Sequence, residues 1–472
     1  MTEPAFDRNR IAAFRFTRCS FDPQTGEVQL GYGFDDLSEL VEVLRFPGAP
    51  FTLDAARAAA VQRALRLLHL IAGVSYYKAA VPPTIRIDGA PIDAATSSLL
   101  ELLYENGLGE FAYRNGLDLR GRIRFPHADA PSDAPSDAPR SAPHSAPHSV
   151  PHSVPSAGLR AHALVAIGGG KDSLVSIEAL RHAGVAQTIS WIGASPLIRA
   201  CAERTGLPTL NVTRTLAPAL FEYNKQGALN GHIPVTAINS AILALAALLA
   251  DADAVVFSNE RSASYGSLIP GTGEVNHQWS KSWEFERRFA AHLRSHVAAD
   301  LQYYSLLRPL SELAVARQFA RTDHYDSWFS SCNRNFHILG ERPAQRWCGA
   351  CPKCHFVFLA LAPFMPKPRL MAIFGRNLLD EPEQAPGFDA LLEYREHKPF
   401  ECVGEGIESR AAMAALAATA TWREDALVAR FAEEIRPQLV DADLSLPPLL
   451  EPQGEHGIPP GLWSTLLENF RS

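Results

Sequence analysis

The chain has 472 residues, of which 47% are hydrophobic and 20% are charged, and this length predicts two or three globular domains. It contains 44 Lys and Arg residues against 51 Asp and Glu residues, a formal net charge of −7. Affinity for nucleic-acid phosphates comes from clustered Lys and Arg, so this balance argues against a nucleic-acid partner. The N-terminus lacks the pattern of a signal peptide, and the most apolar stretch, residues 241–250, is too short to cross a bilayer. We therefore expect no membrane association and a cytoplasmic location.

Residues 1–127 predict a small α+β domain. Apolar and polar residues alternate on both sides of a turn at 22–27, which indicates a β-hairpin over 14–34. The spacing of apolar residues predicts helices at 53–72 and 97–113 and a strand at 84–87. Composition alone assigns no chemistry to this domain.

Residues 128–158 form a proline-rich linker. Proline occurs at every fourth position from 131 to 155, in repeats such as Ala-Pro-Ser-Asp and Ala-Pro-His-Ser. Each proline removes an amide donor, so neither helix nor sheet can form. We expect a disordered spacer between folded domains.

Residues 159–330 alternate short apolar strands with helices. The expected strands lie at 162–167, 188–192, 209–212 and 254–257, and the expected helices lie at 173–183, 197–205 and 235–249. Apolar strands that alternate with helices predict a parallel sheet with helices on both faces, hence an α/β nucleotide-binding fold. From residue 361 to residue 472 the strand signals fade, and helices at 411–420 and 424–434 indicate a helical C-terminal region.

A glycine-rich loop joins the first of these strands to the first helix. Its sequence is Gly168-Gly169-Gly170-Lys171-Asp172-Ser173, and a turn of this kind at a helix N-terminus exposes amide groups that bind phosphate. A Walker loop would require glycine at position 165, where Val165 stands, and Ser or Thr at the position of Asp172. A dinucleotide-binding fingerprint would require glycine in place of Ser173. The sequence therefore disfavours both classes.

The loop resembles the pyrophosphatase loop, Ser-Gly-Gly-x-Asp-Ser, of enzymes that cleave ATP between the α and β phosphates, with Gly168 in place of the first serine. The resemblance implies an adenine nucleotide alpha hydrolase-like fold and ATP and Mg²⁺ as cofactors. It further implies that Lys171 and Ser173 stabilise phosphate charge, that Asp172 lies near Mg²⁺, and that adenosine lies near Trp191 and Gly193. The implied pyrophosphate contacts come from Gly168, Gly169, Gly170, Lys171, Asp172 and Ser173.

Four of the seven cysteines form a second motif. They are Cys332, Cys348, Cys351 and Cys354. Four thiolates at such spacing predict a closed tetrahedral zinc site that stabilises structure, and we assign residues 331–360 to a zinc module. His355 or His337 is an alternative to Cys332 as the fourth ligand, and a redox-active cysteine set is an alternative to zinc.

Polar residues follow the strand at 254–257, at the edge where open α/β sheets bind ligands. With nearby polar segments they are the candidates for substrate contacts. The group comprises Asn230, His232, Asn239, Ser258 to Arg261, and Asn276 to Lys281.

Nearly the whole chain outside the linker resembles the MurL epimerases. The segments that carry the resemblance are Phe14 to Phe21, Gly73 to Lys78, Gly168 to Ser173, Ser258 to Arg261 and Lys398 to Cys402. The resemblance implies an isomerase of peptidoglycan synthesis that uses ATP to invert the terminal glutamate of UDP-N-acetylmuramoyl-L-alanyl-L-glutamate, with release of AMP and diphosphate. It also implies functional coupling to a UDP-N-acetylmuramoyl-L-alanine L-glutamate ligase.

Adenylation explains why such an epimerase would consume a nucleotide. The α-proton of a carboxylate is hard to remove because a second negative charge would build up beside the first. The uncharged carbonyl of an acyl-adenylate accepts that charge as an enolate, which a base on one face can form and an acid on the other can reprotonate. Besides Lys171, Asp172 and Ser173 of the loop, the candidate catalytic residues are the proton carriers Glu260, His232, His277, Lys281 and Cys402.

Two other classes remain open from the sequence. An ATP-dependent adenylating enzyme that modifies a nucleobase or tRNA, similar to 7-cyano-7-deazaguanine synthases, would share the loop and the cysteine cluster. A non-enzymatic nucleotide sensor would leave Lys171, Asp172 and Ser173 unexplained.

Overall fold

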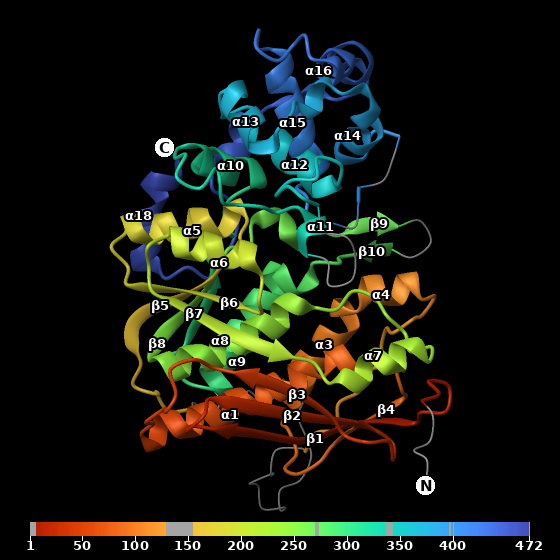
Figure 1. Cartoon of the computed structure of the whole chain (residues 1–472), viewed down its shortest axis with the longest axis vertical. Helices are drawn as coiled ribbons and strands as arrows, with labels where there is room; N and C mark the ends of the chain where they lie inside the picture. The colour runs from red at the N-terminus through yellow and green to blue at the C-terminus, as the bar shows by residue number, and fades with distance from the viewer. Residues whose placement is uncertain are drawn as a thin grey trace, which may run out of the picture.

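The computed structural model describes residues 6–128, 154–269, 273–336, 343–395, 398–399 and 401–471. Residues 129–153, most of the proline-rich linker, lie outside this set, so the disorder expected there stays a prediction. The domain boundaries expected from the sequence also stay predictions. Figure 1 shows a sheet with helices on both faces and a helical C-terminal region at one end of the molecule.

Nine strands form one continuous sheet, in the order β11-β8-β5-β6-β7-β3-β2-β1-β4. Neighbouring strands from β11 to β7 are parallel, and their order reverses between β5 and β8, as in doubly wound α/β folds. These strands are β5 (Arg160–Ala166), β6 (Gln187–Ile192), β7 (Thr209–Thr215), β8 (Ala252–Phe257) and β11 (Gln302–Ser305). The expected parallel sheet is confirmed, whereas the short edge strand β11 was not predicted.

The N-terminal strands extend the same sheet. The predicted hairpin is confirmed as β1 (Ala13–Asp22) and β2 (Glu27–Phe34), and the predicted short strand is β4 (Thr84–Ile87), which pairs with β1. A third strand, β3 (Leu40–Arg45), pairs with β2 and also lies antiparallel to β7. The sheet therefore runs without a break from the first 100 residues into the region that carries the glycine-rich loop.

Helices cover both faces of the parallel half. Along β5 and β8, Leu164 and Val255 face a core that includes α1 (Ala55–Ala72) and α8 (Val235–Ala250). The alternate residues Val165 and Val256 face a second core, which includes α5 (Lys171–His182), α6 (Pro196–Arg204) and α10 (Glu312–Ala320). The expected two-sided covering is confirmed, because strand residues point alternately to opposite faces.

The remaining elements surround these layers. In the N-terminal half, the helix expected at 97–113 is two helices, α3 (Ala94–Gly107) and α4 (Gly109–Arg114), beside the short α2 (Val74–Tyr77). The middle of the chain adds α7 (Pro218–Lys225), α9 (Trp283–His296), β9 (Ser267–Ile269) and β10 (Gly273–Val275). The helical C-terminal region comprises α11 (Asn333–Phe336), α12 (Pro352–Leu361), α13 (Lys367–Phe374), α14 (Ala385–Leu392), α15 (Gly406–Ala417), α16 (Ala426–Arg430), α17 (Pro447–Leu450) and α18 (Pro460–Arg471).

The apolar stretch at residues 241–250 belongs to α8, a core helix that packs on α1 and β8. Within the described ranges, no helix combines the length and the apolar character needed to span a bilayer.

A buried ion pair joins the two halves of the sheet. Arg214 on β7 contacts both carboxylate oxygens of Glu42 on β3, at 2.7 and 3.1 Å, and donates a third bond to the hydroxyl of Ser75. The Glu42 side chain is 0% exposed. A buried carboxylate that loses its partner is strongly destabilising, so this pair fixes how β3 and β7 meet.

We predict that Arg214→Met lowers the free energy of unfolding by about 3–5 kcal/mol, because it leaves the Glu42 charge buried without its partner. Chemical denaturation followed by circular dichroism measures this change. The matched control is Arg45→Met, which removes a cross-strand pair between Arg45 and Glu27 whose arginine is 63% exposed, and it should cost less than about 1 kcal/mol. Equal effects of the two substitutions would contradict the prediction.

Candidate active site

The carboxyl ends of β5 and β8 lie side by side at the point where the strand order reverses. The two strands pair in parallel, so the glycine-rich loop after β5 and residues 258–261 after β8 leave the same edge of the sheet. The hydroxyl groups of Ser176 on α5 and Ser258 lie 2.8 Å apart and link the two segments. Open α/β sheets bind ligands in the crevice at such a reversal. We therefore place the candidate active site at this edge.

The glycine-rich loop has the shape that an anion site requires. Gly169 has a φ of +81°, a conformation that glycine adopts without strain, and its carbonyl accepts a hydrogen bond of 2.9 Å from the Ser330 amide. A Cβ atom on Gly170 would lie 2.5 Å from the Ser331 Oγ, so the loop packs closely against residues 330–331. Because α5 begins at Lys171, directly after Gly170, its first amide groups and its positive dipole end lie at the loop.

Lys171 is buried in a chain of alternating charges. Its side chain is 1% exposed, and its Nζ forms ion pairs with Asp172 and with Glu312, the first residue of α10. The second oxygen of Glu312 lies 4.0 Å from the Nζ of Lys353. Burial alone would lower the pKa of Lys171, but the charges of Asp172 and Glu312 raise it above its usual value. Burial also raises the pKa of Glu312 to about 7, although Lys171 opposes that shift.

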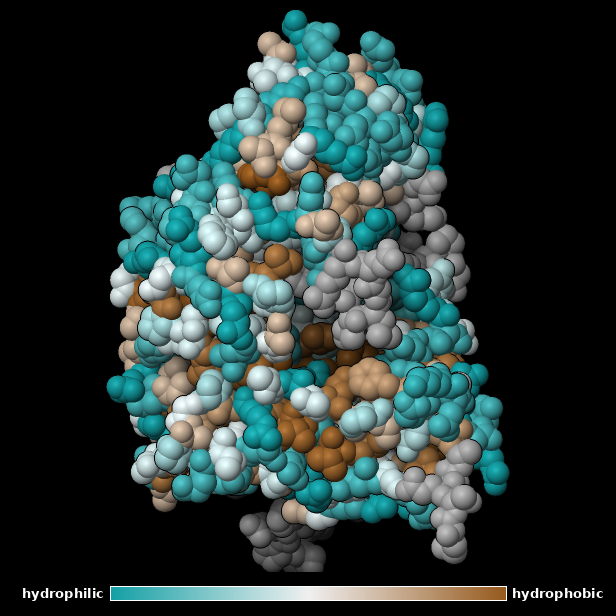
Figure 2. All heavy atoms as spheres, viewed as in Figure 1, coloured by the Kyte–Doolittle hydropathy of each residue, from teal (hydrophilic) through white to brown (hydrophobic). Residues whose placement is uncertain are grey.

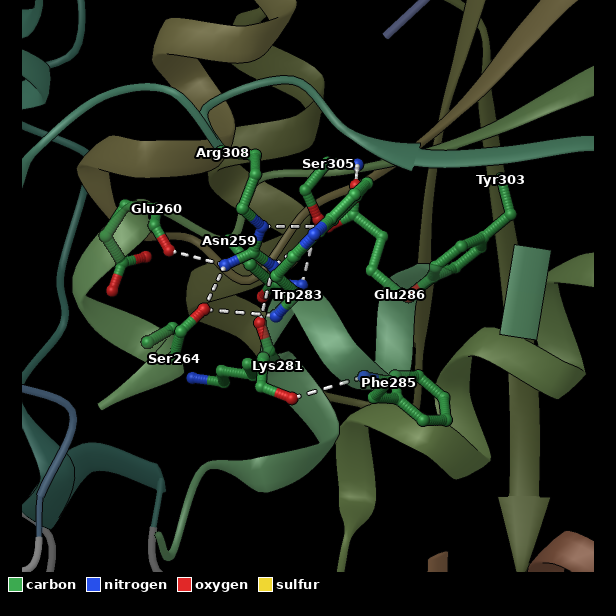
Figure 3. A network of polar contacts seen from close by, with 12 residues as sticks. Asn259, Glu260, Ser264, Lys281, Trp283, Phe285, Glu286, Tyr303, Ser305 and Arg308 are labelled. Carbon is green, nitrogen blue, oxygen red and sulfur yellow. Dashed lines mark hydrogen bonds and ion pairs between the residues drawn. The ribbon is translucent and has the colours of Figure 1, made fainter. Parts of the chain in front are cut away.

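Arg308 fixes the backbone of two predicted proton carriers at once (Figure 3). Its guanidinium lies 2.9 Å from the carboxylate of Glu286 and donates to the carbonyl oxygens of Glu260, at 2.7 Å, and Lys281, at 2.5 Å. In Figure 3 the Glu260 carboxylate and the Lys281 ammonium extend to the same side of this network, away from the guanidinium. The network thus positions both side chains without neutralising them.

Lys281 also contacts Cys402. Its Nζ lies 3.0 Å from the Cys402 Sγ, although 121 positions separate the two residues. Burial acts to lower the pKa of Lys281, but the charges of Cys402 and Glu260 raise it above its usual value. Lys281 therefore remains a cation at neutral pH and lies beside the Cys402 sulfur.

The two predicted histidines form a second group. The rings of His232 and His277 lie 5.9 Å apart, and the Nδ1 of His232 lies 3.8 Å from a carboxylate oxygen of Glu110 on α4. Burial and the charge of Lys281 lower the pKa of His277 to about 4, so this histidine is neutral at neutral pH. The charge of Lys281 also acts to lower the pKa of His232 and the pKa of Asp172, so both groups lie within electrostatic range of this lysine.

The two residues expected near adenosine occupy different environments. Gly193 follows the end of β6 with a φ of +94°, and its amide donates to the carbonyl of Val212 at 2.9 Å. Trp191 is 5% exposed and belongs to the core on the α5 face, and its Nε1 has no hydrogen-bond partner among the residues that the structure describes. Contact of either residue with adenosine stays a prediction.

The four cysteines of the second motif come together as expected. Their Sγ atoms all lie within 4.8 Å of one another, with Cys348 at 3.7 Å and Cys351 at 3.5 Å from Cys354. Sulfurs bound tetrahedrally at 2.3 Å from zinc would be ~3.8 Å apart, so the group can hold a metal ion. His355 instead contacts Gln384 at 2.8 Å, and His337 lies outside the described residues.

The cysteine cluster is connected to the glycine-rich loop. The Cys332 amide donates to the Ser330 hydroxyl at 3.2 Å, and the Ser330 amide in turn holds the Gly169 carbonyl. The Ser330 hydroxyl also donates to the carbonyl of Arg346 at 2.6 Å. A metal bound by the cluster would therefore stabilise the segment that packs against the loop.

Several charged residues of the site were missed from the sequence. Glu312 is the first residue of α10, a helix that was not predicted, and Lys353 lies inside the cysteine motif, where only the cysteines were considered. Glu110 lies in the N-terminal half, as does Lys78, whose Nζ lies 2.7 Å from the Oδ1 of Asn230. Burial lowers the pKa of Lys78 to about 8. A buried cation beside a predicted substrate segment is a signal that only the fold reveals.

Figure 2 shows the surface in the same view as Figure 1. This face is mostly hydrophilic, but it is hollowed near its middle, where hydrophobic side chains are exposed. Such a combination is typical of small-molecule sites.

The chain belongs to the MurL family. The family models match as the MurL N-terminal domain over residues 5–306 and the MurL C-terminal domain over residues 328–445.

Three relatives are named UDP-N-acetyl-alpha-D-muramoyl-L-alanyl-L-glutamate epimerase. The protein from Xanthomonas oryzae pv. oryzae is 67% identical over 466 residues, which cover 99% of each chain. The protein from a Micromonospora species is 42% identical and covers 96% of this chain and 97% of its own length. The protein from Salinispora tropica is 42% identical and covers 90% of this chain and 89% of its own length.

We predict that the cysteine cluster binds about one zinc ion per chain, because four clustered thiolates form a closed tetrahedral site. Cys348→Ser should remove the metal, lower the melting temperature and weaken ATP binding, since the cluster supports the segment that holds the loop. Metal analysis, thermal unfolding and nucleotide titration measure these effects. Cys19→Ser is the matched control, because Cys19 lies on β1 outside the cluster. Stoichiometric iron would refute the zinc assignment, and full ATP binding by the metal-free variant would show that the cluster does not support the loop.

Proposed function

We propose that the protein inverts the α-carbon of the terminal L-glutamate of UDP-N-acetylmuramoyl-L-alanyl-L-glutamate, in an ATP-dependent reaction that forms AMP and diphosphate. The observation that carries this proposal is the 67% identity, over 99% of the chain, to a protein named for that substrate. The glycine-rich loop lies at one edge of the sheet beside a buried charged cluster, which we define as Lys171, Asp172, Glu312 and Lys353. This arrangement supports the use of ATP. The protein would act in peptidoglycan precursor synthesis, after the ligase that adds L-glutamate.

The loop would activate the glutamate carboxylate. The α-carboxylate of glutamate would attack the α-phosphorus of ATP, diphosphate would leave, and an acyl-adenylate would form in which the carboxyl group no longer carries a charge. Amides at the start of α5, Lys171 and Ser173 would hold the leaving diphosphate, while Asp172 would bind Mg²⁺. Lys171 is already charged and is held at the loop by Asp172 and Glu312, so its positive charge is in place beside the proposed phosphate site.

Two groups on opposite faces of the α-carbon would then move the proton. We assign the base to His277, which is neutral because its pKa is about 4 and can therefore accept the α-proton. We assign the acid on the opposite face to Cys402, whose S–H would return a proton to the α-carbon and whose Sγ lies 3.0 Å from the Lys281 Nζ. Proton exchange with water then restores both groups. Glu260 keeps Lys281 charged, and His232 and Glu110 position His277. Water finally cleaves the adenylate, which releases AMP and the free acid with D-glutamate.

We predict that the purified protein, incubated with ATP, Mg²⁺ and the UDP-muramoyl dipeptide, converts L-glutamate to D-glutamate with stoichiometric AMP. Ser173→Ala and Asp172→Ala should each reduce AMP formation at least ~100-fold, because each removes a group that stabilises charge at the transferring phosphate. Chiral chromatography of the hydrolysed product and nucleotide analysis measure both quantities.

The matched control for this experiment is Ser464→Ala, on the exposed face of α18, which should leave the rate unchanged. Normal AMP release by folded Ser173→Ala protein would exclude the loop as the phosphate site. Racemisation of glutamate without ATP would exclude the adenylation scheme itself.

We predict that product formed in D₂O carries deuterium at the glutamate α-carbon, and that exchange requires ATP, because only the adenylated carboxyl group, which is uncharged, permits an enolate. Cys402→Ser and His277→Gln should still release diphosphate but should each stop epimerisation, since each removes one of two proton carriers. Each variant should exchange the α-proton of only one glutamate enantiomer. One variant should exchange the L form and the other variant the D form. Proton NMR of both enantiomers as substrates measures this exchange.

Cys19→Ala serves as the thiol control in the exchange experiment. If Cys402→Ser and His277→Gln protein both epimerise at the normal rate, the two-carrier assignment is wrong while the overall reaction stands. Retention of the original hydrogen in D₂O would instead indicate a single shielded carrier.

A further inference from the structure

A groove of about 1000 Å³ lies next to the charged cluster, between α4 and the segment that leads into α9. We call it the α4 groove. Its lining includes Asn106, Tyr113, Asp118, Asn276, Trp279 and Trp283. Its volume is at the upper end of the range typical of small-molecule sites.

Aromatic side chains from both walls line the α4 groove. Tyr113 on α4 is 44% exposed, and Trp279 and Trp283 lie on the facing segment. Aromatic rings offer flat apolar surfaces against which the C–H face of a pyranose ring can pack. Between them, the amides of Asn106 and Asn276 and the carboxylate of Asp118 offer acceptors for sugar hydroxyl groups.

The charge of the α4 groove favours a neutral ligand over a nucleotide. Among the described residues, its lining includes the carboxylates of Glu105, Asp118 and Glu284 and a single basic side chain, Arg120. The guanidinium of Arg120 is already paired with Asp118 at 2.9 Å. A diphosphate placed here would meet net negative charge, whereas hydroxyl groups donate well to carboxylates.

The α4 groove and the candidate active site share both of their walls. On α4, Tyr113 faces the groove while Glu110 lies 3.8 Å from His232. On the other wall, Asn276 lines the groove and precedes His277, and Ser264 lines it while accepting a hydrogen bond from Arg308. In the proposed substrate a lactyl group and one alanine separate sugar from glutamate, a reach of about 7–10 Å when extended.

We propose that the α4 groove binds the amino-sugar ring of the substrate, an inference that rests on the proposed function. With the pyranose packed between Tyr113 and the facing tryptophans, the peptide passes over the shared wall and presents its glutamate to the charged cluster. The uridine diphosphate then lies outside the groove. The groove supplies substrate affinity and no catalytic group.

The experiment measures binding of N-acetylmuramoyl-L-alanine, which lacks both the nucleotide and the reacting glutamate, to the full-length protein by saturation-transfer NMR. Tyr113→Ala should weaken its binding about tenfold, and Tyr113→Phe should retain it, because the ring supplies the contact. Asp118→Asn should weaken binding less. Phe221→Ala is the matched control, since Phe221 is an aromatic residue 40% exposed on α7, outside the groove.

Kinetics with the complete UDP-muramoyl dipeptide give an independent readout. Tyr113→Ala should raise its KM about tenfold with kcat nearly unchanged, whereas Phe221→Ala should alter neither. Unchanged sugar binding and unchanged KM in folded Tyr113→Ala protein would overturn the inference. The inference would also be overturned if UMP displaced N-acetylmuramoyl-L-alanine from wild-type protein and Tyr113→Ala abolished UMP binding, because the groove would then hold the nucleotide.

The inference and the proposed function fail in different ways. If wild-type protein binds the muramoyl compound with the expected dependence on Tyr113 but forms no D-glutamate, the reaction is wrong and the sugar site stands. If it epimerises the dipeptide and groove variants behave as wild type, the sugar site is wrong and the reaction stands.

Discussion

The buried ammonium of Lys171 is the interaction on which the architecture of the site depends. Removing such a charge from water costs several kcal/mol, and only nearby carboxylates can offset that cost. One of them, Asp172, is local, but Glu312 comes from the start of α10 and is itself balanced by Lys353 from the cysteine motif. The β5–α5 loop, α10 and the region of α12 must therefore assemble together. The outcome is a preorganised charged site, which suits chemistry in which negative charge is transferred and developed.

The N-terminal half participates directly in this site. Continuity of the sheet from β3 to β7, fixed by the Glu42 and Arg214 pair, holds α4 and the end of α2 against residues 230–232. As a result, Lys78 contacts Asn230 and Glu110 lies beside His232 within that segment. A site built on one half alone would lack the wall that carries α4. This arrangement gives a physical reason for a large substrate to be bound across both halves.

The cysteine cluster contributes through packing. It lies two residues from Ser330, whose amide and hydroxyl fix the glycine loop on one side and Arg346 on the other. A metal held there would restrict this segment and with it the conformation of Gly169 and Gly170. Closed thiolate sites stabilise structure in this manner without contacting substrate.

Sequence alone determined the elements whose signal is local. The hairpin, α1, the four longer parallel strands and their helices follow from apolar periodicity, and the loop and the cysteine motif follow from spacing, because the residues that define them are neighbours in the chain. The strands β3 and β11 were not predicted, although β4, which is as short as β11, was. Only the tertiary structure decided which charges meet: the contact of Lys281 with Cys402 and that of Lys171 with Glu312 join residues more than 100 positions apart. Such pairs depend on burial and on the path of the whole chain, and no local pattern encodes either.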